Sequence, residues 1–209
     1  MGFAEALDRN GWARLPERLD EAALGDLVAR IPMLEVPSRR PVPLAPLSDW
    51  LATTPLPGIM RGLLGEAARP VRALLMAKGE GQTWGIDWHR DTTFAVAEPV
   101  AAPGFDGWVD KGPFYQVQAP WELVARVRTL RIHLDDAGSE QGPLLVRSGS
   151  HAGEGGAPEA VPAARGEVLA MHPLLLHASE PPHSLNPRRV LHVEWAAFEL
   201  PGGLRWAWF

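Results

Sequence analysis

Residues 84–91 read Trp-Gly-Ile-Asp-Trp-His-Arg-Asp, and this stretch carries the strongest pattern in the chain. Side chains of an extended strand alternate between its two faces, so His89 and Asp91 should point the same way while Arg90 points away. An imidazole and a carboxylate that converge from one strand supply two of the three ligands of a two-histidine, one-carboxylate iron(II) site. The same pattern also arises by chance on surface strands, where the carboxylate merely orients the histidine. The metal hypothesis therefore requires a second histidine.

Four later histidines are candidates for the third ligand: His172, His177, His183 and His192. His177 ends the apolar run that starts at Pro173, where a buried strand would deliver its side chain to the mouth of a barrel. Ser179 shares the face of His177 if that strand continues. Arg188 follows eleven residues after His177, and Arg189 is its neighbour. Because an arginine fork beside an iron site can hold a carboxylate through two hydrogen bonds, this order of residues favours a metal site with an adjoining carboxylate pocket.

The composition restricts both the class of protein and the chemistry of the site. The 209 residues are 46% hydrophobic, and we expect a single well-buried domain over residues 1–209. The net charge of −5, without a basic block, argues against nucleic acid or an anionic membrane as a partner. No cysteine is present, so histidine and carboxylate side chains must hold any metal. We find no signal peptide and no membrane-spanning run, and expect a cytoplasmic protein.

The first third of the chain, residues 1–69, is predicted to be mainly helical. Asp20 can cap a helix whose apolar side chains fall on one face, namely Leu24, Leu27, Val28 and Ile31. Residues 11–15 are a possible short strand. Four prolines predict an extended connector over residues 37–46. Two shorter helices are expected after it, one following Ser48 and one over residues 57–67.

From Pro70 onward, short apolar runs alternate with Gly/Pro-rich turns, which indicates an antiparallel sandwich or barrel over residues 70–200. The clearest expected strands are residues 71–77, 127–134, 144–146, 167–171, 174–178 and 190–197. Residues 98–120 are predicted to be a long irregular loop that closes over the substrate, with Trp108 and Lys111 as candidate contacts. A disordered surface insertion is the alternative.

Motifs along the last two thirds of the chain resemble the phytanoyl-CoA dioxygenase family of iron(II)- and 2-oxoglutarate-dependent oxygenases. They are Trp-His-Arg-Asp at 88–91, Gly104-Phe105 with Trp108 and Lys111, Val-Gln-Ala-Pro at 117–120, Leu-Arg-Ile-His-Leu-Asp-Asp at 130–136, Gly-Pro-Leu at 142–144 leading to Gly-Ser-His at 149–151, Leu-Leu-Leu-His-Ala-Ser at 174–179 and Arg-Arg-Val-Leu-His at 188–192. Two positions depart from the family pattern, because Ser148 stands where proline is usual and Arg90 where glutamine is frequent. Both departures leave the ligand residues intact.

The resemblance implies a mostly β fold with N-terminal helices, built as a double-stranded β-helix, the jelly-roll barrel also found in cupins. It implies that His89, Asp91 and His177 bind iron(II). It also implies that 2-oxoglutarate and O2 are consumed to hydroxylate, or otherwise oxidise, a small-molecule substrate with release of succinate and CO2. The retained carboxylate at Asp91 favours hydroxylation over halogenation.

The cosubstrate pocket follows from the same resemblance. Arg188 would bind the distal carboxylate of 2-oxoglutarate, assisted by the hydroxyl of Ser179. Arg189 is the rival, because strand alternation does not settle which of the two arginines points inward. Lys78, which lies shortly before the His-x-Asp stretch, could reach the same pocket, although a surface lysine is the simpler interpretation.

One further strand carries polar candidates. Alternation places Thr129, Arg131 and His133 on one face. If that face points inward, Arg131 binds an anion of the substrate or the cosubstrate; if it points outward, Arg131 is a solvated surface residue. His133, on this strand, and Trp84, at the start of the His-x-Asp stretch, are further candidate substrate contacts.

Two other classes of function stay open at this point. A cupin-like module could use the same barrel to bind a metal or ligand without redox chemistry. A hydrolase could use a zinc ion at the same three ligands to activate water. Release of succinate from 2-oxoglutarate under air separates the oxygenase from both. The substrate and the oligomeric state are not indicated by the sequence.

Overall fold

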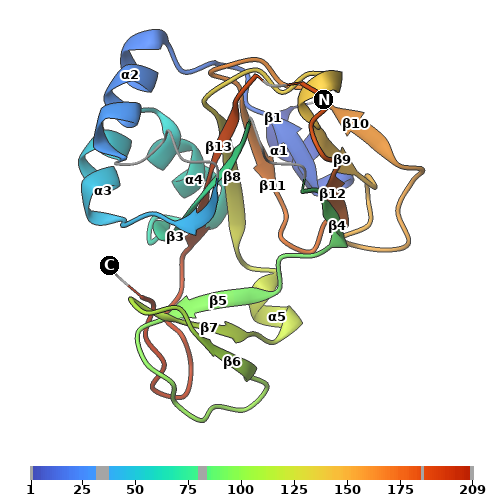
Figure 1. Cartoon of the computed structure of the whole chain (residues 1–209). Helices are drawn as coiled ribbons and strands as arrows, with labels where there is room; N and C mark the ends of the chain where they lie inside the picture. The colour runs from blue at the N-terminus through green and yellow to red at the C-terminus, as the bar shows by residue number, and fades with distance from the viewer. Residues whose placement is uncertain (1, 32–37, 80–83, 185, 208–209) are drawn as a thin grey trace.

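The framework of the fold is a six-stranded antiparallel sheet with the strand order β1-β11-β8-β13-β3-β2. In the computed structural model, which describes residues 2–31, 38–79, 84–184 and 186–207, these strands are β1 (Trp12–Arg14), β2 (Ser38–Pro41), β3 (Arg69–Lys78), β8 (Arg128–His133), β11 (Val168–Met171) and β13 (Arg188–Ala196). The longest strands, β3 and β13, pair with each other near the centre of the sheet. Figure 1 shows this sheet running through the middle of the molecule.

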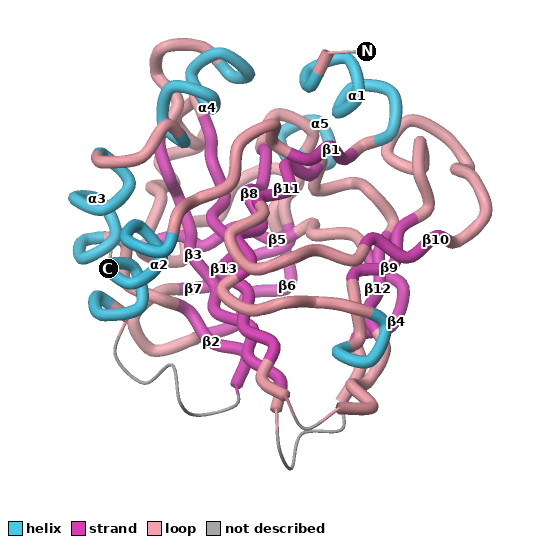
Figure 2. Tube along the Cα trace, turned by 90° about the horizontal axis from the view of Figure 1, so that it is seen from above, coloured by secondary structure: helices cyan, strands magenta, loops and turns pink. Residues whose placement is uncertain are grey.

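A second, four-stranded sheet faces the first across the interior, as the view from above shows (Figure 2). Its order is β10-β9-β12-β4, with β4 at Ile86–His89, β9 at Leu144–Val146, β10 at Glu159–Val161 and β12 at His177–Ser179. From β3 onward the chain passes repeatedly between the two sheets, for example from β3 to β4, from β8 to β9 and from β11 through β12 to β13. This connectivity is that of a double-stranded β-helix, so the predicted fold class is confirmed.

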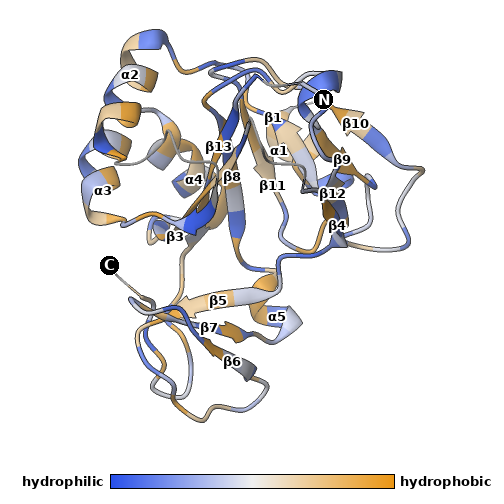
Figure 3. Ribbon diagram, viewed as in Figure 1, coloured by the Kyte–Doolittle hydropathy of each residue, from blue (hydrophilic) through white to orange (hydrophobic). Residues whose placement is uncertain are grey.

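Helices cover the outer face of the six-stranded sheet. They are α2 (Glu21–Arg30), α3 (Ala45–Ala52) and α4 (Leu56–Leu64), while α1 (Phe3–Asn10) packs beside β1. Asp20 caps α2 as predicted, since its carboxylate accepts a 2.8 Å hydrogen bond from the Ala23 amide. The helices and the sheet share one apolar core, in which Trp50 is fully buried and donates its indole hydrogen to the Ala23 carbonyl. Apolar residues gather on these helices and on the central strands in Figure 3.

Strand β13 shows how one face of the six-stranded sheet packs in the apolar core while the other face lines a cavity. Leu191, Val193 and Trp195 lie in the core under the helices. Arg188 and His192, which alternate with them, line a cavity between the two sheets. Because side chains alternate along a strand, a single sequence serves both purposes.

Residues 98–120 are not the irregular loop that we predicted. They contain β6 (Asp106–Asp110) and β7 (Tyr115–Gln118), which form a small sheet with β5 (Thr93–Val96) in the order β5-β7-β6. This sheet and the short helix α5 (Trp121–Val124) lie at the lower end of the molecule in Figure 1. Trp108 packs against a second apolar cluster there, beside Phe94 and Trp206. The aromatic residues of the segment are therefore explained by packing.

Other boundaries differ from the sequence predictions for local reasons. The expected strand over 174–178 is wrong in its first half, because the Leu175 amide bonds the His172 carbonyl in a turn and β12 begins only at His177. Residues 38–41 form a paired strand rather than a bare connector, and Pro37 lies outside the described residues. Helix α3 starts at Ala45, before Ser48, because a proline is tolerated in the first helical turn. In the described ranges, no helix has the length and apolar character needed to cross a bilayer.

Candidate active site

The three predicted metal ligands come together at one end of the four-stranded sheet. His89 is the last residue of β4, His177 is the first residue of β12, and the two are directly paired across these strands. Asp91 lies just beyond the end of β4, where its amide donates a 2.9 Å hydrogen bond to the Pro173 carbonyl. The turn that precedes β12 therefore also fixes the carboxylate.

The geometry of this triad fits a small transition-metal ion. One ligand atom from each of His89, Asp91 and His177 lies within 4.8 Å of the others. The Asp91 carboxylate oxygens are 3.8 Å from Nε2 of His89 and 3.7 Å from Nε2 of His177. Ligands on one face of an octahedral iron site are about 3 Å apart, so a small inward movement would complete the face.

Both imidazoles are oriented by backbone carbonyls. Nδ1 of His89 is 2.7 Å from the carbonyl of Asp87, and Nδ1 of His177 is 2.9 Å from the carbonyl of Leu175. A carbonyl can only accept, so each Nδ1 carries a hydrogen, and Nε2, on the side of Asp91, is the nitrogen left to bind a metal. Fixing the tautomer through the second nitrogen is how proteins prepare a histidine for a metal.

The charges around the triad keep its carboxylate ionised. Burial by itself would raise the pKa of Asp91, but the neighbouring His177, His89 and Arg72 bring that pKa below its usual value. Arg72 is held in turn by a buried ion pair with Glu194 and by a hydrogen bond to Thr93. An ionised carboxylate with two neutral imidazoles is the donor set that iron(II) needs.

Beside the triad is a group of buried cations. Arg188 is 1% exposed and donates hydrogen bonds to the carbonyls of Gln141 and Gly142. Lys78, which pairs with Arg188 across β3 and β13, is 2% exposed. Its ammonium donates to Oγ of Ser179 at 3.0 Å and to the Glu180 carbonyl at 2.7 Å. Burial, with the charges of Arg188 and Arg131, lowers the pKa of Lys78 to about 7.

Arg189 points away from these groups. Its guanidinium makes two 2.7 Å hydrogen bonds with both carboxylate oxygens of Asp135. It does not line the cavity that contains the triad, whereas Arg188 does. The alternation along β13 thus turns Arg188 inward and Arg189 outward.

Arg131 is also turned inward and buried, and its Nη1 donates a 2.7 Å hydrogen bond to Nε2 of His192. His133 shares its face but is fully buried, with Nδ1 3.0 Å from the Glu167 carbonyl, and it is not among the residues that line the cavity. Burial, followed by the charge of Arg131, lowers the pKa of His133 to about 3. The structure therefore brings Arg131, but not His133, to the site.

The cavity between the sheets joins the triad to the cations. It is lined by Arg39, Leu74, Met76, Lys78, Trp84, Ile86, His89, Asp91, Arg131, Leu144, His177, Ala178, Ser179, Arg188 and His192. Its side chains leave about 20 Å³ for water-sized occupants, roughly one water molecule. A larger ligand therefore requires side chains around the cavity to move. The Lys78 ammonium lies over the Trp84 ring, 4.9 Å from its centre. Trp108 and Lys111 do not line this cavity.

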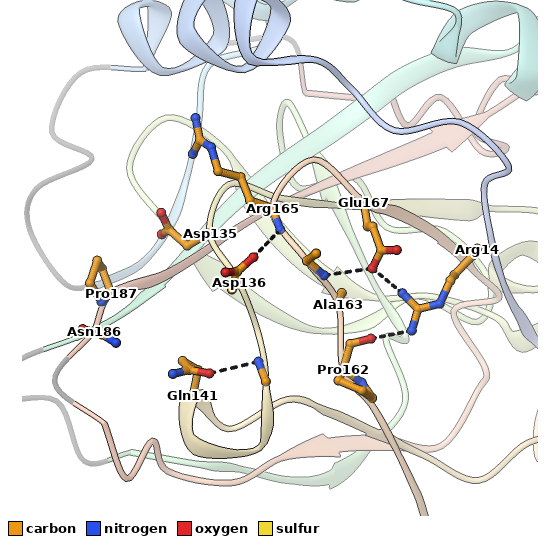
Figure 4. Close-up of a pocket in the computed structure, with 12 residues that line it drawn as sticks. Arg14, Asp135, Asp136, Gln141, Pro162, Ala163, Arg165, Glu167, Asn186 and Pro187 are labelled. Carbon is orange, nitrogen blue, oxygen red and sulfur yellow. Dashed lines mark hydrogen bonds and ion pairs between the residues drawn. The ribbon is translucent and has the colours of Figure 1, made fainter.

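A wider hollow of about 780 Å³ lies elsewhere and contains none of the triad residues. Figure 4 shows that the Arg14 guanidinium donates to the Glu167 carboxylate in this hollow. The backbone amide of Arg165 donates to the side-chain carboxylate of Asp136. The polar groups of the hollow are largely satisfied without a ligand, so we place no chemistry there.

Two features of the site were missed in the sequence. Arg39 stands at the cavity in the proline-rich segment that was interpreted as a connector, and no motif marks it. His192 was considered only as a metal ligand, although the structure makes it the partner of Arg131. Its position four residues after Arg188, on the same face of a strand, was a usable signal.

Comparisons with known proteins agree with this architecture. The chain is similar to the non-heme alpha ketoglutarate dependent epimerase SnoN from nogalamycin biosynthesis, at 19% identity and a TM-score of 0.66, covering 96% of this chain and 89% of that one. It is similar to iron-bound EctD from S. alaskensis, at 18% identity and a TM-score of 0.66, with coverage of 93% and 75%. It is also similar to iron-bound HygX from Streptomyces hygroscopicus, at 14% identity and a TM-score of 0.67, with coverage of 94% and 86%.

At these identities the solved structures establish the shared fold alone, and no curated protein matches the chain. The family assignment comes from the sequence itself. Residues 48–190, more than half of the chain, match the family described as Phytanoyl-CoA dioxygenase (PhyH). The chain therefore belongs to the phytanoyl-CoA dioxygenase family, whose members are oxidoreductases that use iron(II), 2-oxoglutarate and O2.

Proposed function

We propose that this protein oxidises a C–H bond of a small molecule, in the simplest case by hydroxylation, with 2-oxoglutarate as cosubstrate. The overall reaction converts substrate, 2-oxoglutarate and O2 into hydroxylated product, succinate and CO2. The observation that supports this most strongly is the convergence of His89, Asp91 and His177 within 4.8 Å, beside buried cations in one cavity. A metal ion alone would not require those cations.

In this proposal His89, Asp91 and His177 hold iron(II), which supplies the activation of O2 and of the keto acid. The three side chains would hold the ion from one side, and the ion would supply the chemistry that activates the cosubstrate and O2. The backbone bonds to both imidazoles keep their Nε2 atoms directed at the metal position. The role of the protein is to fix these groups and to exclude water.

Arg188 is proposed to bind the distal carboxylate of 2-oxoglutarate, with Ser179 and Lys78 beside it. A guanidinium can hold a carboxylate through two parallel hydrogen bonds, and burial strengthens such a pair. Lys78 already donates to the Ser179 hydroxyl, so an arriving carboxylate would enter a set of existing donors. Binding an anion would also favour the charged form of Lys78.

The assay that tests this function is succinate release from 2-oxoglutarate, with iron(II) and air, over a panel of small molecules. Wild-type protein should release succinate, and His177→Ala should not. His183→Ala is the matched control, because this exposed histidine lies off the site. Iron(II) binding, measured separately by calorimetry, should be lost in His177→Ala and retained in His183→Ala.

The two alternative functions, a non-redox binding module and a hydrolase, predict a different result in the succinate assay. A non-redox cupin-like module or a metal-dependent hydrolase would release no succinate and would have no use for a buried arginine and lysine next to its metal. Small-molecule substrates are typical of the family, and the panel identifies the substrate of this chain by the compound that raises succinate release. A cytoplasmic location stays a prediction from the sequence.

A further inference from the structure

Arg131 has more hydrogen-bond donors than the protein uses. The side chain is 3% exposed, and its Nη1 bonds His192. Its Nε and Nη2 are buried and have no hydrogen-bond partner among the described residues. A buried cation with unused donors is costly, because water no longer solvates it. Natural proteins usually keep such a group for a ligand or an ordered water.

The neighbours of Arg131 do not neutralise it. His192 accepts its hydrogen bond through Nε2 and stays uncharged, because burial, followed by the charge of Arg131, puts the pKa of His192 well below its usual value. Asp91 is the only carboxylate among the described residues that line the cavity, against the four cations Arg39, Lys78, Arg131 and Arg188. The site therefore carries an excess of positive charge that an anion would offset.

Arg131 and Arg188 occupy different positions along the cavity. Arg131 faces His192 across β8 and β13, and Arg188 is four residues before His192 on the same face of β13. Four residues of strand span about 13 Å, which places Arg131 and Arg188 at separate points along the cavity. Arg131 also lies within electrostatic reach of Asp91, at the metal end, and of Arg188, at the other end.

2-Oxoglutarate has a carboxylate at each end of a five-carbon chain. We propose that Arg131 binds the carboxylate next to the keto group, while Arg188, Lys78 and Ser179 bind the distal one. This inference rests on the proposed function and extends it, because each carboxylate then has its own cation. Arg131 acts in this proposal as a cosubstrate-binding residue that orients the keto acid toward the triad.

Two keto acids distinguish the binding site for the keto-acid carboxylate from the binding site for the distal carboxylate. 2-Oxoglutarate carries both carboxylates, whereas 2-oxopentanoate keeps the keto acid end and has a methyl group in place of the distal carboxylate. Affinities for both are measured by calorimetry on iron(II)-loaded protein without O2. Arg188→Ala should lower the affinity for 2-oxoglutarate at least tenfold and change the affinity for 2-oxopentanoate by no more than about twofold. Arg131→Gln should lower the affinities for both keto acids by the same factor. We expect at least a tenfold loss, which corresponds to about 1.4 kcal/mol of binding free energy.

Arg131→Lys guards against a folding defect, because it keeps the charge and most of the volume. It should bind both keto acids more tightly than Arg131→Gln but less tightly than the wild type, since an ammonium cannot form the paired contact. The thermal midpoint and the iron(II) affinity of each variant are measured alongside, and the iron(II) affinity of Arg131→Gln should not fall.

The outcomes divide cleanly. Unchanged affinity for both keto acids in the Arg131 variants overturns the inference and leaves the proposed function standing. Weakening of 2-oxoglutarate alone also overturns it, because Arg131 would then belong to the distal end. Failure of iron(II)-loaded wild-type protein to bind 2-oxoglutarate at all would instead refute the proposed function.

Discussion

Replacing Arg188 with alanine is the sharpest test of the cosubstrate pocket. The change removes a 1%-exposed guanidinium that donates to the carbonyls of Gln141 and Gly142. Removing the charged partner of a desolvated carboxylate costs about 2–5 kcal/mol of binding. The outcome should lie near the lower limit, because a second cation stands next to Arg188.

That second cation is Lys78. Burial is the main reason that its pKa falls to about 7, and the charge of Arg188 lowers it further. Without Arg188 the pKa of Lys78 should rise, so more of its ammonium is charged at neutral pH and can bind the carboxylate. We therefore expect Arg188→Ala to weaken 2-oxoglutarate by about 30- to 100-fold, or about 2–3 kcal/mol.

The measurement is a calorimetric titration of 2-oxoglutarate into iron(II)-loaded protein. Arg188→Lys should recover part of the loss. Arg189→Ala is the matched control on the neighbouring position, and it should bind 2-oxoglutarate normally because its guanidinium pairs with Asp135 outside the cavity. If Arg189→Ala loses affinity and Arg188→Ala does not, the assignment of the two arginines is reversed and the reasoning from strand alternation fails.

Four other outcomes follow from the structure. His177→Ala should abolish iron(II) binding while the thermal midpoint changes little, and normal iron(II) affinity in this variant would remove His177 from the ligand set. In the wild type, 2-oxoglutarate affinity should fall as the pH rises through about 7, because the free Lys78 loses its proton there and a carboxylate prefers the charged form; Lys78→Met should flatten this dependence, and a parallel slope in both proteins would refute it. Glu194→Met should lower the free energy of unfolding by about 3–5 kcal/mol in urea, because it leaves Arg72 buried without its partner, and a change under about 1 kcal/mol would contradict that account. Trp108→Ala should lower stability and leave keto acid binding unchanged, since this side chain packs in an apolar cluster, and a selective loss of binding would restore it to the substrate site.

Much of the site could be predicted because its residues follow each other at fixed spacings along strands. His89 and Asp91 are separated by one residue at a strand end, and Ser179 is separated from His177 by one residue in the same way. A prediction from such spacing stays correct even when the predicted strand boundaries are wrong by a few residues. The run at Leu174–Leu176 was misplaced as strand, yet His177 still faces His89, because the turn and the strand deliver it to the same place.

What the sequence did not predict depends on contacts between distant segments. The strands at 106–110 and 115–118 are short and lie among Gly/Pro-rich turns, and they pair with each other and with β5 beside an apolar cluster that contains Phe94 and Trp206. The choice between Arg188 and Arg189 depended on which face of β13 the helices cover. Arg39 reaches the cavity only because β2 pairs with β3, more than thirty residues later in the chain.

The double use of β13 has a consequence for how this protein can change over time. Shifting the pairing of a strand by one residue exchanges its two faces. A single inserted or deleted residue within β13 would exchange the faces of the residues on one side of it, so that Arg188 would turn toward the helices or Trp195 would turn away from the core. Lineages of this protein should therefore vary β13 by substitution at constant length, and accept insertions in the turns on either side of it.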